Sequence, residues 1–419
     1  MKRTKLGVII LGLMVIGLGI GGQWRKSGEQ PPGLTVPFLK VPAGFQVTYF
    51  ARGLTDPRVL VWDSQGRLLV SQTGAGSVVV LEDKDHNGEA EPRVLINGLT
   101  QPHGLAFYTD PADQKTYLYI AERQQVARYF YEAASGQLLG TGQNIANLPK
   151  ENIGHFTRTI AFGPNYRSKK LLEGYDQVKT LAPEKLYISV GSSCNVCVEN
   201  TWKRATILES DPNGTYTAEF AGGLRNAVFF VFHPVTKEIW ATEMGRDNLG
   251  DNLPPDEVNI LKVASPEDKF GAKRFGWPFC YGNKIKDLTF SPGVVGQTDL
   301  SSDCSKTEAP VLEIPAHSAP LGLAFVSDNV WPADWQGNLL VAYHGSWNRT
   351  EKTGYKIVRF NINKTGKIIS TQAEDFITGW LAKDEKVWGR PVDLKFGPDR
   401  ALYISDDYSG VIYKVVSVK

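Results

Sequence analysis

The sequence predicts an all-β fold, a six-bladed β-propeller, on three observations. Short apolar or alternating segments separated by turn residues run through a chain of 419 residues that contains 42 glycines and 24 prolines. A similar segment recurs six times, as in "GLTDPRVLVW", "GLTQPHGLAF" and "GRPVDLKFGP". Beyond an apolar leader at the N-terminus, no segment shows sustained helical periodicity.

The six recurring segments end their first strand on an aromatic residue and continue into a second strand, such as "RLLVSQ", "KLYISV" and "ALYISD". Repeats of this kind at intervals of about 45 residues or more are typical of propeller blades. The aromatic residues are Trp62, Phe107, Phe162, Phe232, Phe325 and Phe396. The last repeat has three strands, and we expect "FQVTYFA" (45–51) to supply the fourth and close the ring. The predicted propeller spans 40–419, after a linker at 23–39.

The N-terminal residues 1–22 have the features of a leader helix. Lys2, Arg3 and Lys5 precede an apolar stretch that runs to Gly22. With ~17 residues, this stretch is near the lower limit for crossing a bilayer. We interpret 1–22 as a signal peptide or an N-terminal membrane anchor, attached through residues 6–22. A periplasmic or other extracytoplasmic location follows, and the net charge of +2 gives no indication of a nucleic-acid partner.

Four cysteines fit an oxidising compartment. We prefer the pairing of Cys194 with Cys197 and of Cys280 with Cys304, although four cysteines allow three pairings. A single C-x-x-C is a weak signal for a metal site, and it lacks the setting of a thioredoxin-like redox motif here.

Blade topology places the residues before each first strand and those after each second strand on one face of the propeller. This face would form a polar, cationic funnel suited to a small anionic ligand. Its predicted members are Arg58, His103, His155, Arg158, Arg225, Asn226, His317 and Arg390.

His155 in "GHFTRTIAFGP" is the best candidate for a general base, because a neutral imidazole can take a hydroxyl proton. A histidine that only bonds a turn is an equally good interpretation. Arg225 and Arg390 are suited to clamp carboxylates, or else to form salt bridges between blades. His103 and His317 are ligand contacts or channel packing.

Two acidic segments resemble calcium loops. "EMGRDNLGDNLPPDE" (243–257) combines carboxylates with Gly and Pro backbone and suits calcium, or it is a solvated acidic loop. "DKDHNGEAE" (83–91) has Val94 where an EF-hand needs its last acid, so a hairpin turn on the opposite face is the better interpretation. His86 and His233 fall on that opposite face and receive no role.

Several motifs in order resemble the pyrroloquinoline quinone-dependent glucose/sorbosone dehydrogenases over 40–419. They are "HFTRTIAFGP", "LYISVGSSCNVC", "GLRNAVFFVFHP", "EMGRDNLGDNLPPDEVNIL", "FGWPFCYG", "HGSWNR" and "GRPVDLKFGPD". The resemblance implies a six-bladed propeller that oxidises an aldose or sorbosone-type sugar, with pyrroloquinoline quinone and Ca²⁺ as cofactors. The sugar and the electron acceptor stay unidentified.

The resemblance also implies roles for individual residues. His155 matches the catalytic base, and Arg225 with Asn226 matches the pair that contacts the quinone. Gly245 and Arg246 match positions whose carbonyls hold calcium, with Asp247 beside them. The remaining expected cofactor contacts are Lys352, Arg390, His103, His317 and Arg158.

Three positions depart from the glucose-oxidising members. Gly154 and Ser192 stand where carboxylates precede and support the histidine, and Val392 stands where a second arginine follows Arg390.

A calcium-dependent lactonase is one alternative function. A non-catalytic propeller that binds a carbohydrate or a protein is another, with Trp347 and Trp388 as stacking platforms.

Overall fold

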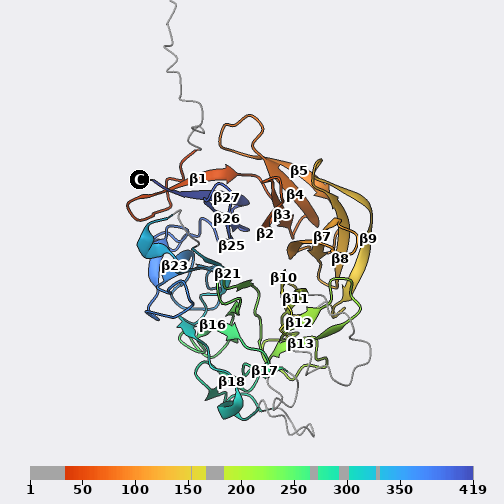
Figure 1. Cartoon of the computed structure of the whole chain (residues 1–419). Helices are drawn as coiled ribbons and strands as arrows, with labels where there is room; N and C mark the ends of the chain where they lie inside the picture. The colour runs from red at the N-terminus through yellow and green to blue at the C-terminus, as the bar shows by residue number, and fades with distance from the viewer. Residues whose placement is uncertain are drawn as a thin grey trace, which may run out of the picture.

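Six β-sheets form a ring in the computed structural model, which describes residues 34–151, 153–166, 184–264, 272–291, 302–326 and 331–418 (Figure 1). Blade one contains β2 (Pro57–Trp62), β3 (Leu68–Gln72), β4 (Ser77–Glu82) and β5 (Glu91–Ile96). Blade two contains β6 (Leu105–Thr109), β7 (Thr116–Ala121), β8 (Gln125–Glu132) and β9 (Gln137–Asn147). Blade three contains β10 (Ile160–Pro164), β11 (Glu184–Val190), β12 (Thr206–Ser210) and β13 (Thr217–Gly222), with β17 (Lys273–Arg274) added in parallel.

The second half of the ring has the same plan. Blade four contains β14 (Phe230–Phe232), β15 (Ile239–Glu243), β16 (Asp256–Leu261) and β20 (Leu312–Ile314). Blade five contains β21 (Pro320–Phe325), β22 (Leu339–Tyr343), β23 (Lys356–Phe360) and β24 (Glu374–Ile377). Blade six contains β25 (Pro391–Phe396), β26 (Leu402–Asp406), β27 (Val411–Ser417) and β1 (Phe45–Ala51). The insertion in blade four carries the small hairpin of β18 (Cys280–Tyr281) and β19 (Ile285–Lys286), and the turns η3 (Cys304–Lys306) and η4 (Ala333–Trp335) complete the elements.

The predicted six-bladed propeller is confirmed, and so is its strand order. Each of the six aromatic residues that marked a repeat lies in the first strand of a blade. Figure 1 shows β2, β10, β21 and β25 nearest the middle of the ring, with β5 and β9 at its rim. Both predicted disulfides are formed, and they use all four cysteines of the sequence.

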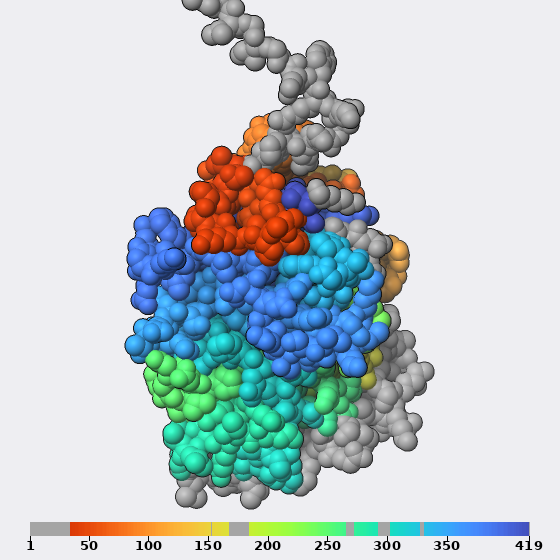
Figure 2. Space-filling model, turned by 90° about the vertical axis from the view of Figure 1, so that its left-hand side faces the viewer, coloured from red at the N-terminus to blue at the C-terminus, as the bar shows by residue number. Residues whose placement is uncertain are grey.

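The N-terminal strand closes the ring as expected. β1 pairs antiparallel with β27, beginning with Phe45 opposite Ser417. Figure 2 shows the first described residues, in red, lying directly on the blue C-terminal part of the chain. Phe45 fits among Trp331, Trp335 and Phe376, with ring centroids 4.9, 4.8 and 5.1 Å apart. The leader 1–22 and most of the linker 23–39 lie outside the described residues. No helix in the described part of the chain is long and apolar enough to cross a membrane.

Hydroxyl side chains in the second strands join neighbouring blades. Ser189 accepts from the backbone N–H of Thr159 at 2.9 Å within its own blade, and it donates to the carbonyl of Val228 in the next blade at 3.2 Å. Ser405 makes the same pair of bonds between blades six and one. Each bond satisfies a buried polar group of an inner strand, so the strands stay in register around the axis.

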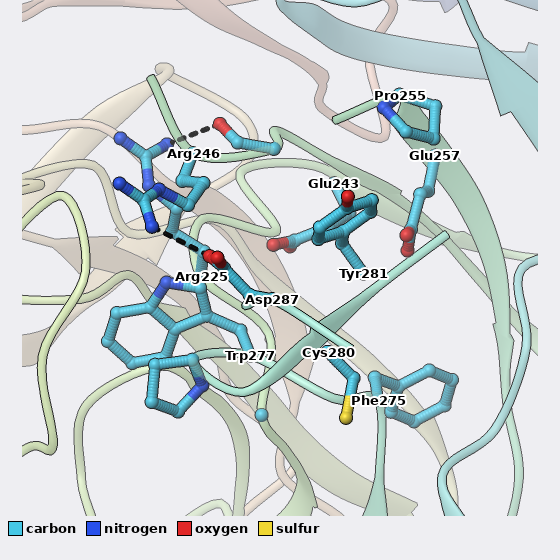
Figure 3. A pocket seen from close by; sticks show the side chains of 13 residues that line it. Arg225, Glu243, Arg246, Pro255, Glu257, Phe275, Trp277, Cys280, Tyr281 and Asp287 are labelled. Atoms are coloured by element: carbon cyan, nitrogen blue, oxygen red, sulfur yellow. Dashed lines mark hydrogen bonds and ion pairs between the residues drawn. The ribbon is translucent and has the colours of Figure 1, made fainter. Parts of the chain in front are cut away.

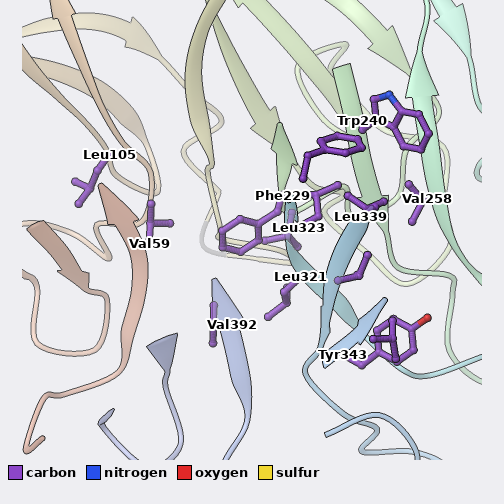
Figure 4. Packing of buried hydrophobic residues seen from close by; sticks show 14 of the residues in the cluster. Val59, Leu105, Phe229, Trp240, Val258, Leu321, Leu323, Leu339, Tyr343 and Val392 are labelled. Atoms are coloured by element: carbon purple, nitrogen blue, oxygen red, sulfur yellow. The ribbon is translucent and has the colours of Figure 1, made fainter. Parts of the chain in front are cut away.

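Apolar side chains of the inner strands fill the space around the axis below the polar face (Figure 4). Val59, Leu105, Leu321 and Val392 come from four blades, and each is at most 5% exposed. Val392, where the resemblance implied a second arginine, is fully buried in this cluster. These side chains separate the polar face from the rest of the axis.

The closure contact gives a direct stability test. Replacing Phe45 by alanine removes a ring that packs against three aromatic neighbours, so we expect the free energy of unfolding to fall by about 3–5 kcal/mol. Leu34→Ala is the matched control, because Leu34 is 58% exposed. Urea unfolding of both variants measures the difference. Equal stability of the two variants would show that β1 does not hold the ring closed.

Candidate functional site

The predicted site residues lie where the inner strands begin. His155 and Arg158 precede β10, Arg225 precedes β14, and Arg390 precedes β25, while Arg58 is the second residue of β2. Because every inner strand runs in the same direction along the axis, these residues share one end of the propeller. The structure therefore brings most of the predicted funnel to a single face.

Ser192 holds the His155 ring in one tautomer. The ring Nδ1 lies 3.0 Å from the Ser192 Oγ and 3.1 Å from the Ser192 carbonyl oxygen. The Ser192 hydroxyl donates its own proton to the carbonyl of Cys194 at 2.6 Å, so it accepts from the imidazole. Nδ1 therefore carries the hydrogen, and Nε2 keeps the lone pair that can receive a proton.

The surroundings of His155 keep the ring neutral. Burial and, after it, the charges of Arg225, Arg158 and Arg204 together lower its pKa to about 3, although the bond to the Ser192 backbone raises it. The largest contributions to this shift are burial and the charge of Arg225, and the two departures at Gly154 and Ser192 lie next to this ring in the sequence or in contact with it.

Backbone geometry explains one of those departures. Gly154 has a φ of +66°, and a Cβ at this position would lie 2.4 Å from the Ser192 carbonyl oxygen. An aspartate therefore does not fit before the histidine in this chain.

Asn195 anchors the Arg225 guanidinium and was missed by the sequence reasoning. Arg225 Nε donates to the Asn195 carbonyl at 2.9 Å, and Nη2 donates to the Asn195 Oδ1 at 3.0 Å. Nη2 also pairs with Asp247 Oδ2 at 3.0 Å. The Cys194–Cys197 disulfide brackets Asn195. The only sequence signal for this anchor is its place between the two cysteines.

Backbone carbonyls of the predicted calcium segment converge on the same guanidinium. Arg225 Nη1 donates to the Gly245 carbonyl at 2.9 Å and to the Met244 carbonyl at 3.4 Å. Together with Asp247 Oδ2 they form an all-oxygen set of the kind that calcium prefers. The donor chemistry therefore fits a hard cation, although Arg225 occupies these oxygens here. Arg246 points its side chain elsewhere and pairs with Asp287 at 2.6 Å.

Other carboxylates of 243–257 accept hydrogen bonds from backbone N–H groups of the protein. Asp256 accepts from the N–H groups of Gly245 and Ala319, both at 2.8 Å. Asp251 accepts from the N–H of Thr350 at 3.0 Å. The segment is thus neither a ring of free carboxylates nor a fully solvated loop.

A cavity lies beside Arg225, under the same segment (Figure 3). Glu243 and Glu257 line it, together with Arg246, Tyr281 and Asp287 among others. Burial raises the pKa of Glu257 to about 7 and that of Glu243 well above its usual range, and the charge of Glu257 adds to the shift of Glu243. Carboxyl groups therefore line this side of Arg225, and burial favours their protonated forms.

A second cluster joins blades five, six and one. Asp407 forms an ion pair with Arg58 and lies 2.9 Å from the His344 Nε2. Burial raises the pKa of Asp407, but His344 and Arg58 lower it more, to about 2. Arg390 Nε donates to the carbonyl of His344 at 3.2 Å. The sequence placed Arg58 and Arg390 on this face but did not single out His344 or Asp407.

Only some of the N–H donors of the Arg158 guanidinium have hydrogen-bond partners in the described part of the chain. Its Nη1 donates to the carbonyls of His155 and Thr157 at 3.0 and 2.7 Å, but its buried Nε and Nη2 have no hydrogen-bond partner in the described part of the chain. Burial and the charges of Arg204 and Arg123 lower its pKa to about 9. An anionic cofactor would relieve this charge, so the residues fit a quinone that carries carboxylates.

The remaining residues that were predicted to contact the cofactor differ from one another in burial and in hydrogen bonding. His103 is fully buried and packs edge-on against Phe229, with centroids 5.5 Å apart. Asn226 has a buried Oδ1 with no partner among the described residues. His317 bonds the Gly250 carbonyl through Nε2 at 2.8 Å. The exposed Lys352 donates to the Glu385 carbonyl at 2.7 Å, away from both clusters.

The two half-buried histidines predict an acid-dependent stability. Burial lowers the pKa of His344 to about 4, against about 3 for His155. In the unfolded chain both return to about 6.5, so acidification adds protons to the unfolded state first. The free energy of unfolding then falls with pH by up to roughly 1.4 kcal/mol per unit for each histidine.

We expect the urea midpoint to drop between about pH 7 and pH 4.5, and His344→Gln to make this slope shallower. The difference between variant and parent isolates the histidine from the carboxylates, which are the same in both. Parallel slopes would show that His344 is not held neutral.

Comparison with known proteins shows which family this chain resembles. The TrAA12-like family model matches residues 39–418. An uncharacterized protein of Borreliella burgdorferi is 29% identical over 90% of this chain and 90% of its own length. The pyrroloquinoline quinone-dependent pyranose dehydrogenase of Coprinopsis cinerea is 27% identical over 90% of this chain, which spans only 54% of that protein.

The fold is also found among solved structures. A Trichoderma reesei structure from carbohydrate-active enzyme family AA12 has a TM-score of 0.71 and 24% identity, with 93% of this chain and 100% of that chain covered. The resemblance to quinone-dependent sugar dehydrogenases is thereby confirmed, and the chain belongs to the TrAA12-like family.

Proposed function

We propose that this protein oxidises a sugar with pyrroloquinoline quinone as its cofactor. The observation that carries the proposal is the His155 ring, whose Nδ1 is tied to Ser192 and whose Nε2 is left to accept a proton beside three arginines. Family membership supports it, as does the name of the Coprinopsis cinerea relative. The bound quinone would accept a hydride from the carbon that bears the reacting hydroxyl.

The residues of this chain would supply binding, orientation and proton transfer. His155 Nε2 takes the hydroxyl proton, and Ser192 keeps the ring turned for that transfer. Arg225, Arg158 and Arg390 hold carboxylates of the cofactor by charge-assisted hydrogen bonds. Asn195 fixes the orientation of Arg225, whose bonds to the Gly245 carbonyl and to Asp247 would be exchanged for contacts to the cofactor.

Calcium would bind at the Gly245–Asp247 segment. The carbonyls of Gly245 and Arg246 and the carboxylate of Asp247 would hold the ion, with Arg225 yielding the Gly245 carbonyl. An ion there would stabilise negative charge on a bound quinone oxygen.

The proposed setting is extracytoplasmic. Two disulfides fit an oxidising compartment, and the leader 1–22 would export the protein or hold it at the membrane. The substrate is a small sugar, and a separate electron acceptor must reoxidise the cofactor.

The alternative functions have less support. A lactonase would need free carboxylates that converge on the axis, whereas Asp407 is paired with Arg58 and Asp247 with Arg225. Trp388 is 44% exposed, but its ring already stacks on Phe38, with centroids 6.0 Å apart, and lies 3.8 Å from the Lys386 Nζ. Trp347 is 74% exposed, but no second observation assigns it a ligand.

Replacing the base tests the reaction. His155→Gln keeps a polar side chain but removes the proton acceptor, so sugar-dependent dye reduction should fall by roughly 10²-fold or more. Quinone binding should stay within a few-fold, measured by fluorescence titration. His86→Gln, the same change at an exposed turn, should leave both unchanged. Unimpaired turnover in His155→Gln would exclude His155 as the base.

Replacing Arg225 tests cofactor binding separately from turnover. Arg225→Ala removes a donor to a cofactor carboxylate, so binding should weaken by about 1.5–3 kcal/mol in an equilibrium titration. Arg52→Ala is the control, because Arg52 makes an exposed ion pair with Glu89 away from the axis. If both variants bind equally well, Arg225 does not hold the quinone.

A further inference from the structure

One short loop is bonded, directly or through its neighbour Ser192, to the proposed base, to Arg225 and to the predicted calcium segment. It is the disulfide loop, residues 194–197, which the bond between Cys194 and Cys197 closes. It lies between β11 and β12, where the chain leaves the second strand of blade three. That strand ends at the polar end of the axis, so the disulfide loop belongs to the face that carries the candidate site.

The first contact reaches His155 through Ser192. The Ser192 carbonyl accepts from the His155 backbone N–H at 3.0 Å, and the Ser192 Oγ lies 3.0 Å from the ring Nδ1. The Ser192 hydroxyl donates its own hydrogen to the Cys194 carbonyl at 2.6 Å, so it accepts from the imidazole. The Cys194 carbonyl therefore keeps this hydroxyl in the orientation that favours a hydrogen on Nδ1.

The second contact holds Arg225 through Asn195. The carbonyl and the Oδ1 of Asn195 both accept from the guanidinium, at 2.9 and 3.0 Å. Trp277 Nε1 donates to the same carbonyl at 3.3 Å. The backbone N–H of Ser192 also donates to the Arg225 carbonyl at 2.7 Å. The backbone and the side chain of Asn195 must therefore both keep their orientation for the guanidinium to keep these bonds.

The third contact reaches the predicted calcium segment. Asn195 Oδ1 accepts from the backbone N–H of Asp247 at 2.8 Å, and Asn195 Nδ2 donates to the Asp247 carbonyl at 3.0 Å. These two bonds fix the backbone of Asp247 against the disulfide loop. One asparagine is thus bonded both to a residue proposed to hold the quinone and to a residue proposed to hold the ion.

The disulfide limits the conformations open to Asn195. Asn195 lies inside the loop that the S–S bond closes, with Val196 as the only other residue between the two cysteines. A cross-link of this kind removes many conformations of the segment that it closes. Ser193 is held from outside the loop, because its N–H and its hydroxyl donate to the Glu199 carboxylate at 2.6 and 2.8 Å. Both cysteines are half-buried, so a small reductant can reach the bond.

We propose that the Cys194–Cys197 disulfide is a redox-dependent positioning element, which holds His155, Arg225 and Asp247 in place when it is closed and releases them when it is reduced. The inference rests on the proposed function for what these residues bind. Reduction by a small dithiol supplies two electrons and two protons and breaks the S–S bond. The protein is left with two thiols, and the reductant becomes a cyclic disulfide. The sulfur atoms take no part in the oxidation of the sugar.

The first test needs neither cofactor nor sugar. In long-range ¹H–¹⁵N spectra of the oxidised protein, His155 should carry its hydrogen on Nδ1. After anaerobic reduction and removal of the reductant, we expect both tautomers, because the Ser192 hydroxyl is no longer held toward the Cys194 carbonyl. Reoxidation should restore the Nδ1 form. The same single tautomer in both redox states would overturn the proposal.

The second test measures quinone binding in both redox states, with calcium present and the reductant removed. Reduction should weaken binding by roughly 10-fold or more, as the loss of a residue that orients binding groups does, and reoxidation should restore it. Asn195→Ala with the disulfide closed should weaken binding by a similar factor, and reduction of this variant should then add little. Losses that multiply would show that the disulfide does not act through Asn195 and would overturn the proposal.

Two further variants show which disulfide responds. Cys194→Ser/Cys197→Ser should behave as the reduced parent does and should not change on reduction, whereas a remaining response would come from Cys280–Cys304 and would overturn the proposal. Val198→Ser is the matched control, because Val198 follows the disulfide loop directly and is 37% exposed. It should keep the redox response of the parent. If the double variant does not fold, Asn195→Ala and reduction of the parent decide the question.

The outcomes separate the two proposals. If the oxidised parent binds no quinone, the proposed function fails, and the His155 spectra still decide whether the disulfide positions the base. If the oxidised parent binds quinone and reduction changes neither the affinity nor the His155 tautomer, only the positioning proposal is wrong. A loss of binding that reoxidation does not restore would assign the disulfide a purely structural role and would also overturn the proposal.

Discussion

The antiparallel pairing of β1 with β27 is the contact on which the other features depend. It joins residues near opposite ends of the chain, and without it blade six would expose an unpaired strand edge. Closure also fixes the inner strands around the axis, where Ser189 and Ser405 bond backbone groups of neighbouring blades. A ring opened at this seam would separate Arg58 from Asp407, and with them the second half of the polar face.

Within the closed ring, burial determines the chemistry of the polar face. An apolar cluster that includes Val59 and Val392 packs around the axis just below it. Arginines at its edge are held by backbone carbonyls, as Arg225 is by Asn195 and Arg390 is by His344. Carbonyls orient a guanidinium without cancelling its charge. The face therefore holds oriented arginines together with the carboxylates of Asp247 and Asp407, and the arginine charges keep His155 neutral.

Much of the fold could be predicted from the sequence because propeller blades repeat. The recurring aromatic at the end of each first strand located all six blades, and the unpaired last repeat pointed to 45–51 as the closing strand. The two disulfides also followed from spacing and an exported context. These features depend on local sequence patterns, on the number of strands in each repeat, or on the number and spacing of the cysteines.

The details of the site depend on contacts between distant residues, which no local pattern encodes. His344 and Asp407 are 63 positions apart, and Asn195 meets Arg225 from another loop. Lys352 matched a family position but bonds the Glu385 carbonyl, because the direction of its loop is set by neighbours in space. Gly154 shows the converse case, where a sequence departure became intelligible once its positive φ and its closeness to Ser192 were known.

The central claim is that ring closure gathers one cationic, base-containing binding face at the axis. A crystal structure of the protein with pyrroloquinoline quinone and calcium tests it most directly. The account predicts the quinone at the axial face, with its carboxylates on the guanidinium groups of Arg225 and Arg390 and one carbonyl within reach of the substrate bound at His155. A quinone seated in the acidic cavity beside Glu243 and Glu257, or anywhere away from His155, would contradict it.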